Sequence, residues 1–419
     1  MADSLPGPYP PLPTRLAGAL IDAPAMRTAG RELLSLALMD ARNHTLHLLA
    51  LCEAASPRGI LAGGEIGDPL WLAGHVGWFA EFWIARNVQC HQGVQCPARP
   101  TRLGSIEPRA DAWWGEAPAP QSVGRLPDAM ATRAFLLEQH ERTLELLEKA
   151  REDDAGLYFY RLALLHEDMR GEDMLVQAQQ CGMAVPLAQP GPRRAMPPVR
   201  VPAVRWHLGA VPGGLVLDNE QWAHAVDVPE FEIDAQAVSW AQFVEFVDDG
   251  GYDRNELWHP DGWAWLQALA QQEGGRAPRY VDQIGVASGA VMQTRFGTPR
   301  RMLGGQPAMH VTWWEADAWC RWAGRRLPAE VEWEIAALTA AHHGFHWGDV
   351  WEWTGTTFRA YPNFTAGPWR AYSEPFFGSH KVLRGASFAT RQRMRQPKFR
   401  NFELPQANHV FAGFRSCAA

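Results

Sequence analysis

Residues 310–334 read HVTWWEADAWCRWAGRRLPAEVEWE, a segment that joins a helix, a turn and a second, amphipathic helix. A glycine and a proline mark the turn between the two helical parts. Three shorter segments follow in a fixed order: GDVWEWT (348–354), VLRGASF (382–388) and FAGFRSC (411–417). Each alone is an ordinary packing motif of tryptophans, glycine turns and arginines. Together they predict a loop-rich α+β domain with short strands.

The N-terminal half has a different pattern, in which apolar residues recur with helical spacing. Start signals at Pro127 and Asp128 and a glycine stop at Gly182 support this interpretation. The predicted helices cover residues 31–55, 69–86, 127–150 and 154–182. Four long helices in succession predict a helical bundle.

A proline-rich stretch separates the two patterns. Residues 186–204, PLAQPGPRRAMPPVRVPAV, contain six prolines and predict a linker. We therefore expect a bundle over residues 15–185 and the α+β domain over 205–419, preceded by a disordered tail at 1–14. A chain of 419 residues is long enough for two such domains. Residues 90–125, rich in proline, glycine and arginine, predict a long loop.

Composition excludes several classes of function. The net charge of −7 gives no basic field for nucleic acid or an anionic membrane surface. No run of about 18 apolar residues predicts a spanning helix, and prolines interrupt the N-terminus where a secretory signal would be apolar. The six cysteines are scattered and form no CxxC pair, which indicates a reduced, cytoplasmic protein. The oligomeric state does not follow from these features.

Two histidines lie inside predicted helices of the bundle, His75 in GHVGWF and His166 in LLHEDMRGED. A lone histidine on an apolar helix is ordinarily a core residue with its hydrogen bonds satisfied. Histidines on separate helices of a bundle can also face one core, where bundles form metal sites. Arg170 shares the helix face of His166 but cannot ligate a metal, because it is always cationic. His140 on the third helix is an alternative ligand that the spacing does not require.

The order of these motifs resembles two known folds. From about Arg205 to Cys417 the chain is similar to the formylglycine-generating-enzyme/sulfatase-modifying-factor fold. The helical half resembles a DinB-like bundle, in WLAGHVGWFAEFWIAR (71–86) and RLALLHEDMRGED (161–173). This pairing is typical of the ergothioneine sulfoxide synthases and the related selenoneine synthases. The resemblance covers nearly the whole chain beyond the N-terminal tail.

The resemblance implies a non-haem Fe(II) centre that uses O₂ as co-substrate. In this family one histidine of the second helix and two of an HxxxH motif on the fourth bind the iron. His75 and His166 match the first two ligands, and Arg170 stands at the third. This departure from the family pattern puts iron affinity in question. An imidazole site suits Fe(II) if a third ligand is found.

The resemblance also implies a substrate, hercynine (N,N,N-trimethylhistidine). The segment FRNFELP (399–405) matches the family's binding segment. Asn401 would hydrogen-bond the imidazole or carboxylate, and Phe402 would face the trimethylammonium group. Glu403 stands where the family can carry an acid. The family's proton-donating tyrosine is replaced by Phe358, so Tyr361, the nearest phenol, is the candidate.

The formylglycine generators use two cysteines after their RGGS-like segment. Those positions hold Thr390 and Arg395 here, so this chain should not oxidise a peptide cysteine.

The second substrate is either a selenosugar or a thiol, cysteine or γ-glutamylcysteine. DARNHTLHLLA (40–50) and AYSEPFFGSHKVLRGASFATR (371–391) look closest to the selenoneine synthases. A carboxylate-rich thiol donor would call for arginines near the iron, and Arg99, Arg102 and Arg109 of the long loop are candidates. We predict a selenoneine synthase, with C–S bond formation as the alternative. Two other classes remain open: a homologue that binds a betaine without turnover, and a structural or partner-binding module.

Overall fold

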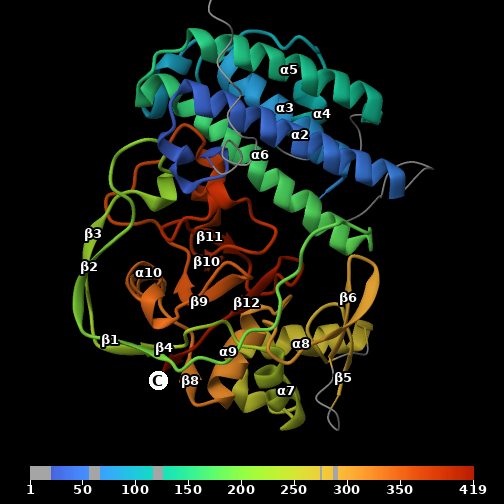
Figure 1. The fold of residues 1–419 in the computed structure, drawn as a ribbon, viewed down its shortest axis with the longest axis vertical. Coiled ribbons are helices and arrows are strands. Elements are labelled where there is room, and N and C mark those ends of the chain that lie inside the picture. The colour runs from blue at the N-terminus through green and yellow to red at the C-terminus, as the bar shows by residue number, and fades with distance from the viewer. Residues whose placement is uncertain (1–19, 56–66, 117–125, 274–275, 286–290) are drawn as a thin grey trace, which may run out of the picture.

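The computed structural model of the chain describes residues 20–55, 67–116, 126–273, 276–285 and 291–419. The predicted disordered tail, 1–14, lies outside these described residues. A helical bundle is followed by a loop-rich α+β domain, which confirms the predicted fold class (Figure 1). Helix α6 (Asp154–Gln180) lies along the boundary between these two parts.

The helices of the bundle begin at residues that cap them. Asp68, Asp128 and Asp153 each accept a hydrogen bond from a backbone N–H of the first turn. The long helices are α2 (Arg31–Ala55), α3 (Pro69–Ala80), α5 (Ala129–Lys149) and α6. Helix α3 continues through a π-helical turn at Glu81–Ala85. Because their apolar residues follow helical spacing, these helices bury a common core.

Short helical segments lie at the edges of the bundle. They are 3₁₀ turns at Pro24–Thr28 and Cys90–Gln95 and helix α4 (Ala110–Trp114). The last two interrupt the predicted long loop 90–125, of which residues 117–125 lie outside the described part of the chain.

The C-terminal domain has four α-helices among the described residues: α7 (Trp240–Asp248), α8 (Pro260–Glu273), α9 (Trp313–Trp322) and α10 (Glu330–Thr339). The segment 310–334, predicted as a helix, a turn and a second helix, corresponds to the pair α9 and α10. Between α9 and α10 the chain turns at Gly324, whose φ of +65° suits glycine. The sequence prediction missed α8, because the proline at its first position is also an ordinary turn signal.

Two four-stranded sheets and two smaller ones complete this domain. Their orders are β1-β4-β13-β8, β11-β10-β9-β12, β2-β3 and β5-β6-β7. The strands are β1 (Val199–Val201), β2 (Val204–Leu208), β3 (His224–Val228), β4 (Phe231–Ile233), β5 (Val281–Ile284), β6 (Val291–Arg295), β7 (Thr298–Met302), β8 (Arg325–Arg326), β9 (Trp351–Thr357), β10 (Lys381–Gly385), β11 (Asn401–Glu403), β12 (Ala412–Phe414) and β13 (Cys417–Ala418). Residues 183–198, which include most of the predicted linker, form no helix or strand.

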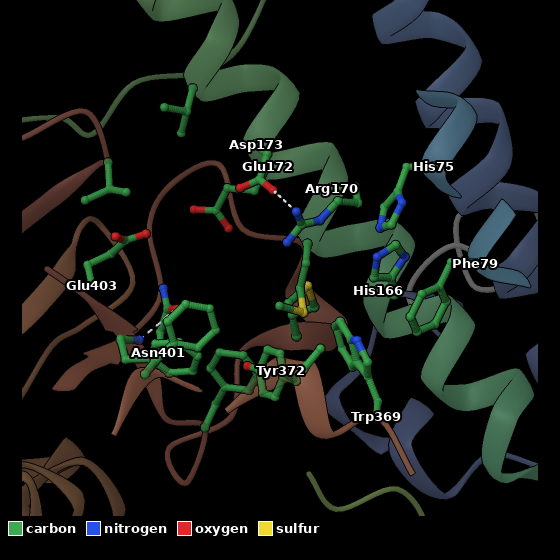
Figure 2. A pocket seen from close by; sticks show the side chains of 18 of the residues that line it. His75, Phe79, His166, Arg170, Glu172, Asp173, Trp369, Tyr372, Asn401 and Glu403 are labelled. Atoms are coloured by element: carbon green, nitrogen blue, oxygen red, sulfur yellow. Dashed lines mark hydrogen bonds and ion pairs between the residues drawn. The ribbon is translucent and has the colours of Figure 1, made fainter. Parts of the chain in front are cut away.

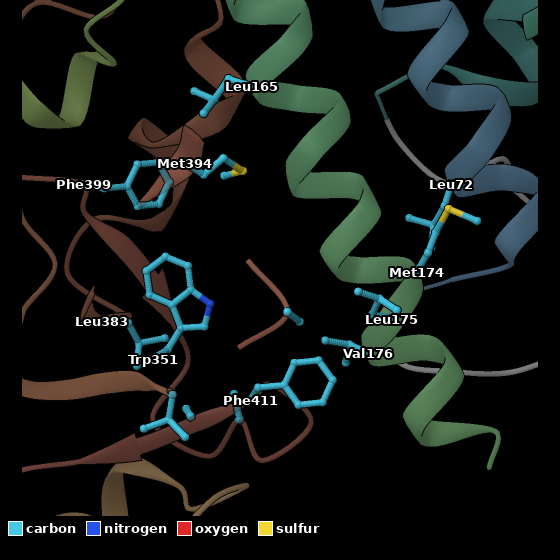
Figure 3. Close-up of a cluster of buried hydrophobic side chains, with 14 of the residues drawn as sticks. Leu72, Leu165, Met174, Leu175, Val176, Trp351, Leu383, Met394, Phe399 and Phe411 are labelled. Atoms are coloured by element: carbon cyan, nitrogen blue, oxygen red, sulfur yellow. The ribbon is translucent and has the colours of Figure 1, made fainter. Parts of the chain in front are cut away.

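The bundle and the C-terminal domain share one apolar core. Figure 3 shows side chains of α6 facing tryptophan, phenylalanine and methionine side chains of the C-terminal domain. Val176 of α6 and Phe411 belong to this buried cluster, as do Met394 and Phe399. This shared core holds α6 against β11 and its neighbours, and a pocket lies at that boundary. Within the described residues, no helix is both long and apolar enough to cross a lipid bilayer.

Candidate active site

The pocket at the boundary between bundle and C-terminal domain has a volume of about 320 Å³. Helices α3 and α6 line one side, and β11 with the segment around Tyr372 lines the other. Figure 2 shows two imidazoles, His75 and His166, on the bundle side, and Asn401 and Glu403 across the cavity. Five residues that the sequence placed in the site therefore line one pocket: His75, His166, Asn401, Phe402 and Glu403.

His75 is fixed by its backbone and aromatic neighbours. Its Nδ1 lies 2.7 Å from the carbonyl oxygen of Trp114, so Nδ1 donates the proton and Nε2 carries the lone pair. The ring stacks on Trp71, with centroids 4.6 Å apart. Helix α4 comes this close because Gly74 has no side chain: a Cβ there would lie 2.0 Å from Nε1 of Trp114. A backbone carbonyl that orients a histidine ring is a common arrangement behind metal-binding imidazoles.

His166 lies almost fully buried in the middle of α6, with only 1% of its surface exposed. Its ring stacks on Phe79 at 3.8 Å and lies 5.0 Å from the ring of His75. Neither ring nitrogen has a hydrogen-bond partner among the described residues. Burial, with smaller contributions from His75 and Arg170, lowers the pKa of His166 well below its usual range. The ring is therefore neutral, with a lone pair that no described protein group uses.

Arg170 stands one helical turn after His166, on the same side of the pocket. Its Nη1 forms an ion pair with Asp173 at 3.0 Å, and its Nε is buried without a partner among the described residues. Three carboxylates of α6 lie close to Arg170 in sequence: Glu167, Glu172 and Asp173. Its ion-pair partner is Asp173. The charge of Arg170, after burial, still lowers the pKa of His75, which lies at about 4.

The other two carboxylates have different partners. Glu167 accepts from the guanidinium of Arg42 and the hydroxyl of Thr45. Glu172 accepts from Ser387, from Thr390 and from the indole of Trp351. Thr390 thus stands at a position of a formylglycine-generator cysteine and hydrogen-bonds α6 instead. Of these three carboxylates of α6, Asp173 is therefore the one that forms an ion pair with Arg170.

The far side of the pocket is aromatic. Phe402 stacks on Phe358 with centroids 4.1 Å apart, and Tyr372 and Phe376 lie 5.6 and 5.3 Å from it. Asn401 accepts the backbone N–H of Phe402 through its Oδ1. Its amide NH₂ is therefore available as a donor to a ligand. Aromatic faces beside an amide and a carboxylate suit a small molecule that carries a quaternary ammonium group.

Tyr361, the predicted catalytic phenol, does not line this pocket. Its hydroxyl donates to Glu330 at 3.2 Å, and its ring lies under the guanidinium of Arg400. Tyr372 lines the pocket instead, and its buried hydroxyl has no partner among the described residues. Burial raises the pKa of Tyr372, so the phenol stays protonated and can donate. Tyr372 lies in the quoted segment 371–391, but nothing in its spacing distinguished it from Tyr361.

Several other predicted candidates also lie outside the pocket lining. Arg102 stacks over Phe82 at 3.5 Å, and Arg109 stacks over Trp113 at 4.1 Å. Arg99 is exposed. His140 is not among the residues lining the pocket, and the charge of Arg42 adds to burial in lowering its pKa to about 4. His140 therefore does not complete a metal site with His75 and His166, and the three arginines are not placed to bind a thiol donor in this pocket.

The site supplies two residues that could ligate an iron ion, whereas the family pattern has three. His75 Nε2 and the nitrogens of His166 are suitable imidazole donors. Among the described residues, no group of three or more His, Cys, Asp or Glu side chains is arranged to hold a metal ion. The position one turn after His166 holds a cation. The described part of the chain therefore does not present the three-ligand iron site that its resemblance implied.

Comparison with known protein families defines the class to which fold and pocket belong. Residues 37–177 match the DinB superfamily, and residues 186–349 and 338–419 match the sulfatase-modifying factor enzyme 1-like domain. The chain is thus a two-domain protein that combines a DinB bundle with a sulfatase-modifying-factor domain. A formylglycine-generating enzyme of Streptomyces coelicolor is 32% identical, but over only 39% of this chain.

Two relatives match nearly the whole chain. The hercynine oxygenase of Mycolicibacterium smegmatis is 32% identical and covers 92% of this chain and 98% of its own length. The hercynine oxygenase of Mycobacterium tuberculosis is 30% identical with the same coverage. The chain belongs to the hercynine oxygenase family, whose members are non-haem iron oxidoreductases.

Proposed function

We propose that this chain binds hercynine in the pocket between α6 and β11 and joins sulfur from a thiol to C2 of its imidazole ring. The reaction would consume the thiol, the imidazole C2–H and O₂, and would give a sulfoxide and water. One bond to sulfur forms at C2, one oxygen atom goes to sulfur, and the second leaves as water with the thiol and ring hydrogens. Fe(II) is the cofactor that the family implies for this chemistry.

The single observation that carries the proposal is the arrangement of the pocket. The aromatic faces of Phe402 and Tyr372 are placed to contact a trimethylammonium group. Asn401 offers an amide donor beside them. A substrate held there would point toward His75 and His166, and no described protein group uses the ring nitrogens of His166. The phenol of Tyr372 could donate a hydrogen bond to the same ligand.

Selenium is the second donor to test. Segments such as 371–391 look closest to selenoneine synthases, whereas the relatives that match most of the chain are hercynine oxygenases. The long-loop arginines that would bind a thiol's carboxylates are outside the pocket lining. Because none of the described long-loop arginines is placed to bind a carboxylate in the pocket, a selenosugar, which carries no carboxylate, is the alternative donor.

The deciding experiment is product mass spectrometry with hercynine, O₂ and Fe(II). Separate reactions would contain γ-glutamylcysteine, cysteine or a selenosugar. We expect a sulfoxide of hercynine with one of the thiols. A C–Se product alone would replace the sulfur proposal by a selenoneine synthase, and no product with any donor would exclude both.

Arg170 favours a second candidate function, betaine binding without turnover. Hercynine titration by calorimetry and iron analysis of the purified protein separate the two. Iron near one per chain with hercynine binding supports the enzyme. Hercynine binding with iron far below one per chain, and no product after iron loading, supports a binding protein.

A further inference from the structure

Buried arginines in this protein are almost all neutralised by a carboxylate. A buried guanidinium without a counter-charge is costly, because several kcal/mol of solvation are lost. Seven of the eight arginines that are buried among the described residues form such an ion pair: Arg42, Arg86, Arg161, Arg384, Arg393, Arg400 and Arg415. The eighth, Arg295 at the end of β6, has no carboxylate partner in the described part of the chain.

The contacts of Arg295 are all with neutral groups. Its Nε donates to the amide oxygen of Gln293 at 2.7 Å, and its Nη1 lies 3.4 Å from the amide oxygen of Gln189. The remaining partners are thioether sulfurs: Met309 at 2.9 Å from Nη1 and Met302 at 3.8 Å from Nη2. Sulfur is a weak acceptor. The guanidinium is thus positioned and 94% buried, yet its charge is left uncompensated by any described residue.

Arg295 lines a cavity of about 170 Å³ that adds two further cations, Arg300 and Arg301. The cavity lies between β7 and the segment around Gln189, and none of the described residues that line it is acidic. The sequence of residues 286–290, VASGA, also contains no acid. Burial and the charge of Arg300 lower the pKa of Arg295 only to about 9, so the guanidinium remains charged at neutral pH.

We propose that this cavity is an anion site that binds a phosphate group through Arg295, Arg300 and Arg301. A guanidinium fork matches two oxygens of a tetrahedral oxyanion, and a second negative charge suits the two exposed arginines. The ligand would be inorganic phosphate or a phosphomonoester, which share this chemistry. The site is separate from the hercynine pocket, but Phe296 next to Arg295 packs against Phe411, which lines that pocket.

The test is thermal unfolding of the full chain in inorganic phosphate against potassium chloride at equal ionic strength. We expect a saturable rise in Tm with phosphate only. Arg295→Met should abolish this rise and should itself raise Tm in phosphate-free buffer, because an unpaired buried charge is replaced by an apolar side chain. Arg205→Gln, an exposed arginine on β2, is the matched control and should leave the response unchanged.

Equal Tm shifts in phosphate and chloride would overturn the proposal, as would an undiminished phosphate response in Arg295→Met. If that variant does not fold, Arg301→Gln tests the same site, because Arg301 is exposed and its replacement should not disturb folding. Loss of one charge-assisted contact should weaken phosphate binding at least about tenfold by calorimetry. An unchanged Kd would contradict the site. Binding of phosphoserine as well as inorganic phosphate would identify a phosphomonoester site, and binding of inorganic phosphate alone would identify a free-phosphate site.

Discussion

On the bundle side of the pocket, His166 and Arg170 keep buried nitrogens without described partners, whereas in the C-terminal domain the buried carboxylate of Glu330 is paired with two guanidinium groups. The nitrogens of His166 and the Nε of Arg170 have no described partner. Across the boundary, Glu330 accepts from both Arg384 and Arg400. Since unpaired buried groups cost stability, they persist where a ligand uses them. The comparison separates side chains that hold the fold from those that await a ligand.

The largest expected effect comes from breaking the paired side. Burial alone would raise the pKa of Glu330, but the charges of Arg400 and Arg384 outweigh it and hold that pKa below its ordinary value. Glu330→Ala leaves Arg400 buried without its carboxylate and should cost about 3–5 kcal/mol in the free energy of unfolding. Urea denaturation measures it, with exposed Glu230→Ala as the control. A loss below about 1 kcal/mol would show that the pairs do not hold the fold.

The second-largest expected effect is on Fe(II) affinity and comes from replacing Arg170 on the bundle side of the pocket. Arg170→His removes a cation beside two imidazoles and adds a ligand. At an effective dielectric of about 20, a unit charge at 4 Å contributes roughly 4 kcal/mol per unit charge, so Fe(II) affinity should rise at least about a hundredfold. Arg170→Gln is the matched control, because it removes the charge without adding a ligand. Equal iron affinity in wild type and Arg170→His would mean that another residue completes the site or that no iron binds.

A smaller effect separates the two histidines. His166→Leu replaces a buried ring whose nitrogens lack partners, so the metal-free protein should gain about 1–2 kcal/mol of stability while losing metal binding. His75→Leu should instead lose stability, because the carbonyl of Trp114 is left without its donor. Denaturant unfolding with chelator present measures both. A destabilised His166→Leu would show that this ring is a packing residue of the fold.

The smallest effect is a pH dependence. Burial chiefly, with nearby arginines, lowers the pKa of both His44 and His140 to about 4. In the unfolded chain these histidines bind protons with a pKa near 6.5, whereas in the folded chain they stay neutral down to about pH 4. The free energy of unfolding therefore decreases as pH falls from about 6.5 to about 4. Both side chains are partly exposed, so each contributes less than about 1 kcal/mol. The double variant His44→Gln with His140→Gln should show a shallower pH profile of unfolding than wild type, and parallel profiles would contradict this.

Sequence pattern predicted the bundle well because local spacing determines it. The helix at 31–55 was predicted with the bounds that the structure gives α2. His75, His166 and the Asn401–Glu403 segment follow from motifs, and the structure brings them to one pocket. The domain break within 186–204 stays a prediction. The match to the DinB superfamily ends at residue 177, and the match to the sulfatase-modifying-factor domain begins at residue 186.

The sequence did not show which tyrosine, Tyr361 or Tyr372, lines the pocket. Tyr361 and Tyr372 are eleven positions apart in a segment with little regular structure, so spacing does not tell which one faces the cavity. The answer depends on Glu330 and Arg400, which draw Tyr361 into a buried network through contacts distant in sequence. The anion site at Arg295 could likewise not be predicted from the sequence, because the absence of a carboxylate beside Arg295 among the described residues depends on the folded arrangement of its neighbours.

Helix α6 determines how this protein can vary by insertion and deletion. His166 faces the imidazole of His75, and Glu172, six residues later, is held by three side chains of the C-terminal domain. Each inserted residue turns a helix by about 100° and lengthens it by about 1.5 Å. One residue added between these two positions would turn either the ring from its neighbour or the carboxylate from its three donors. The spacing from 166 to 172 should therefore tolerate substitutions, as at Arg170, but no change in length.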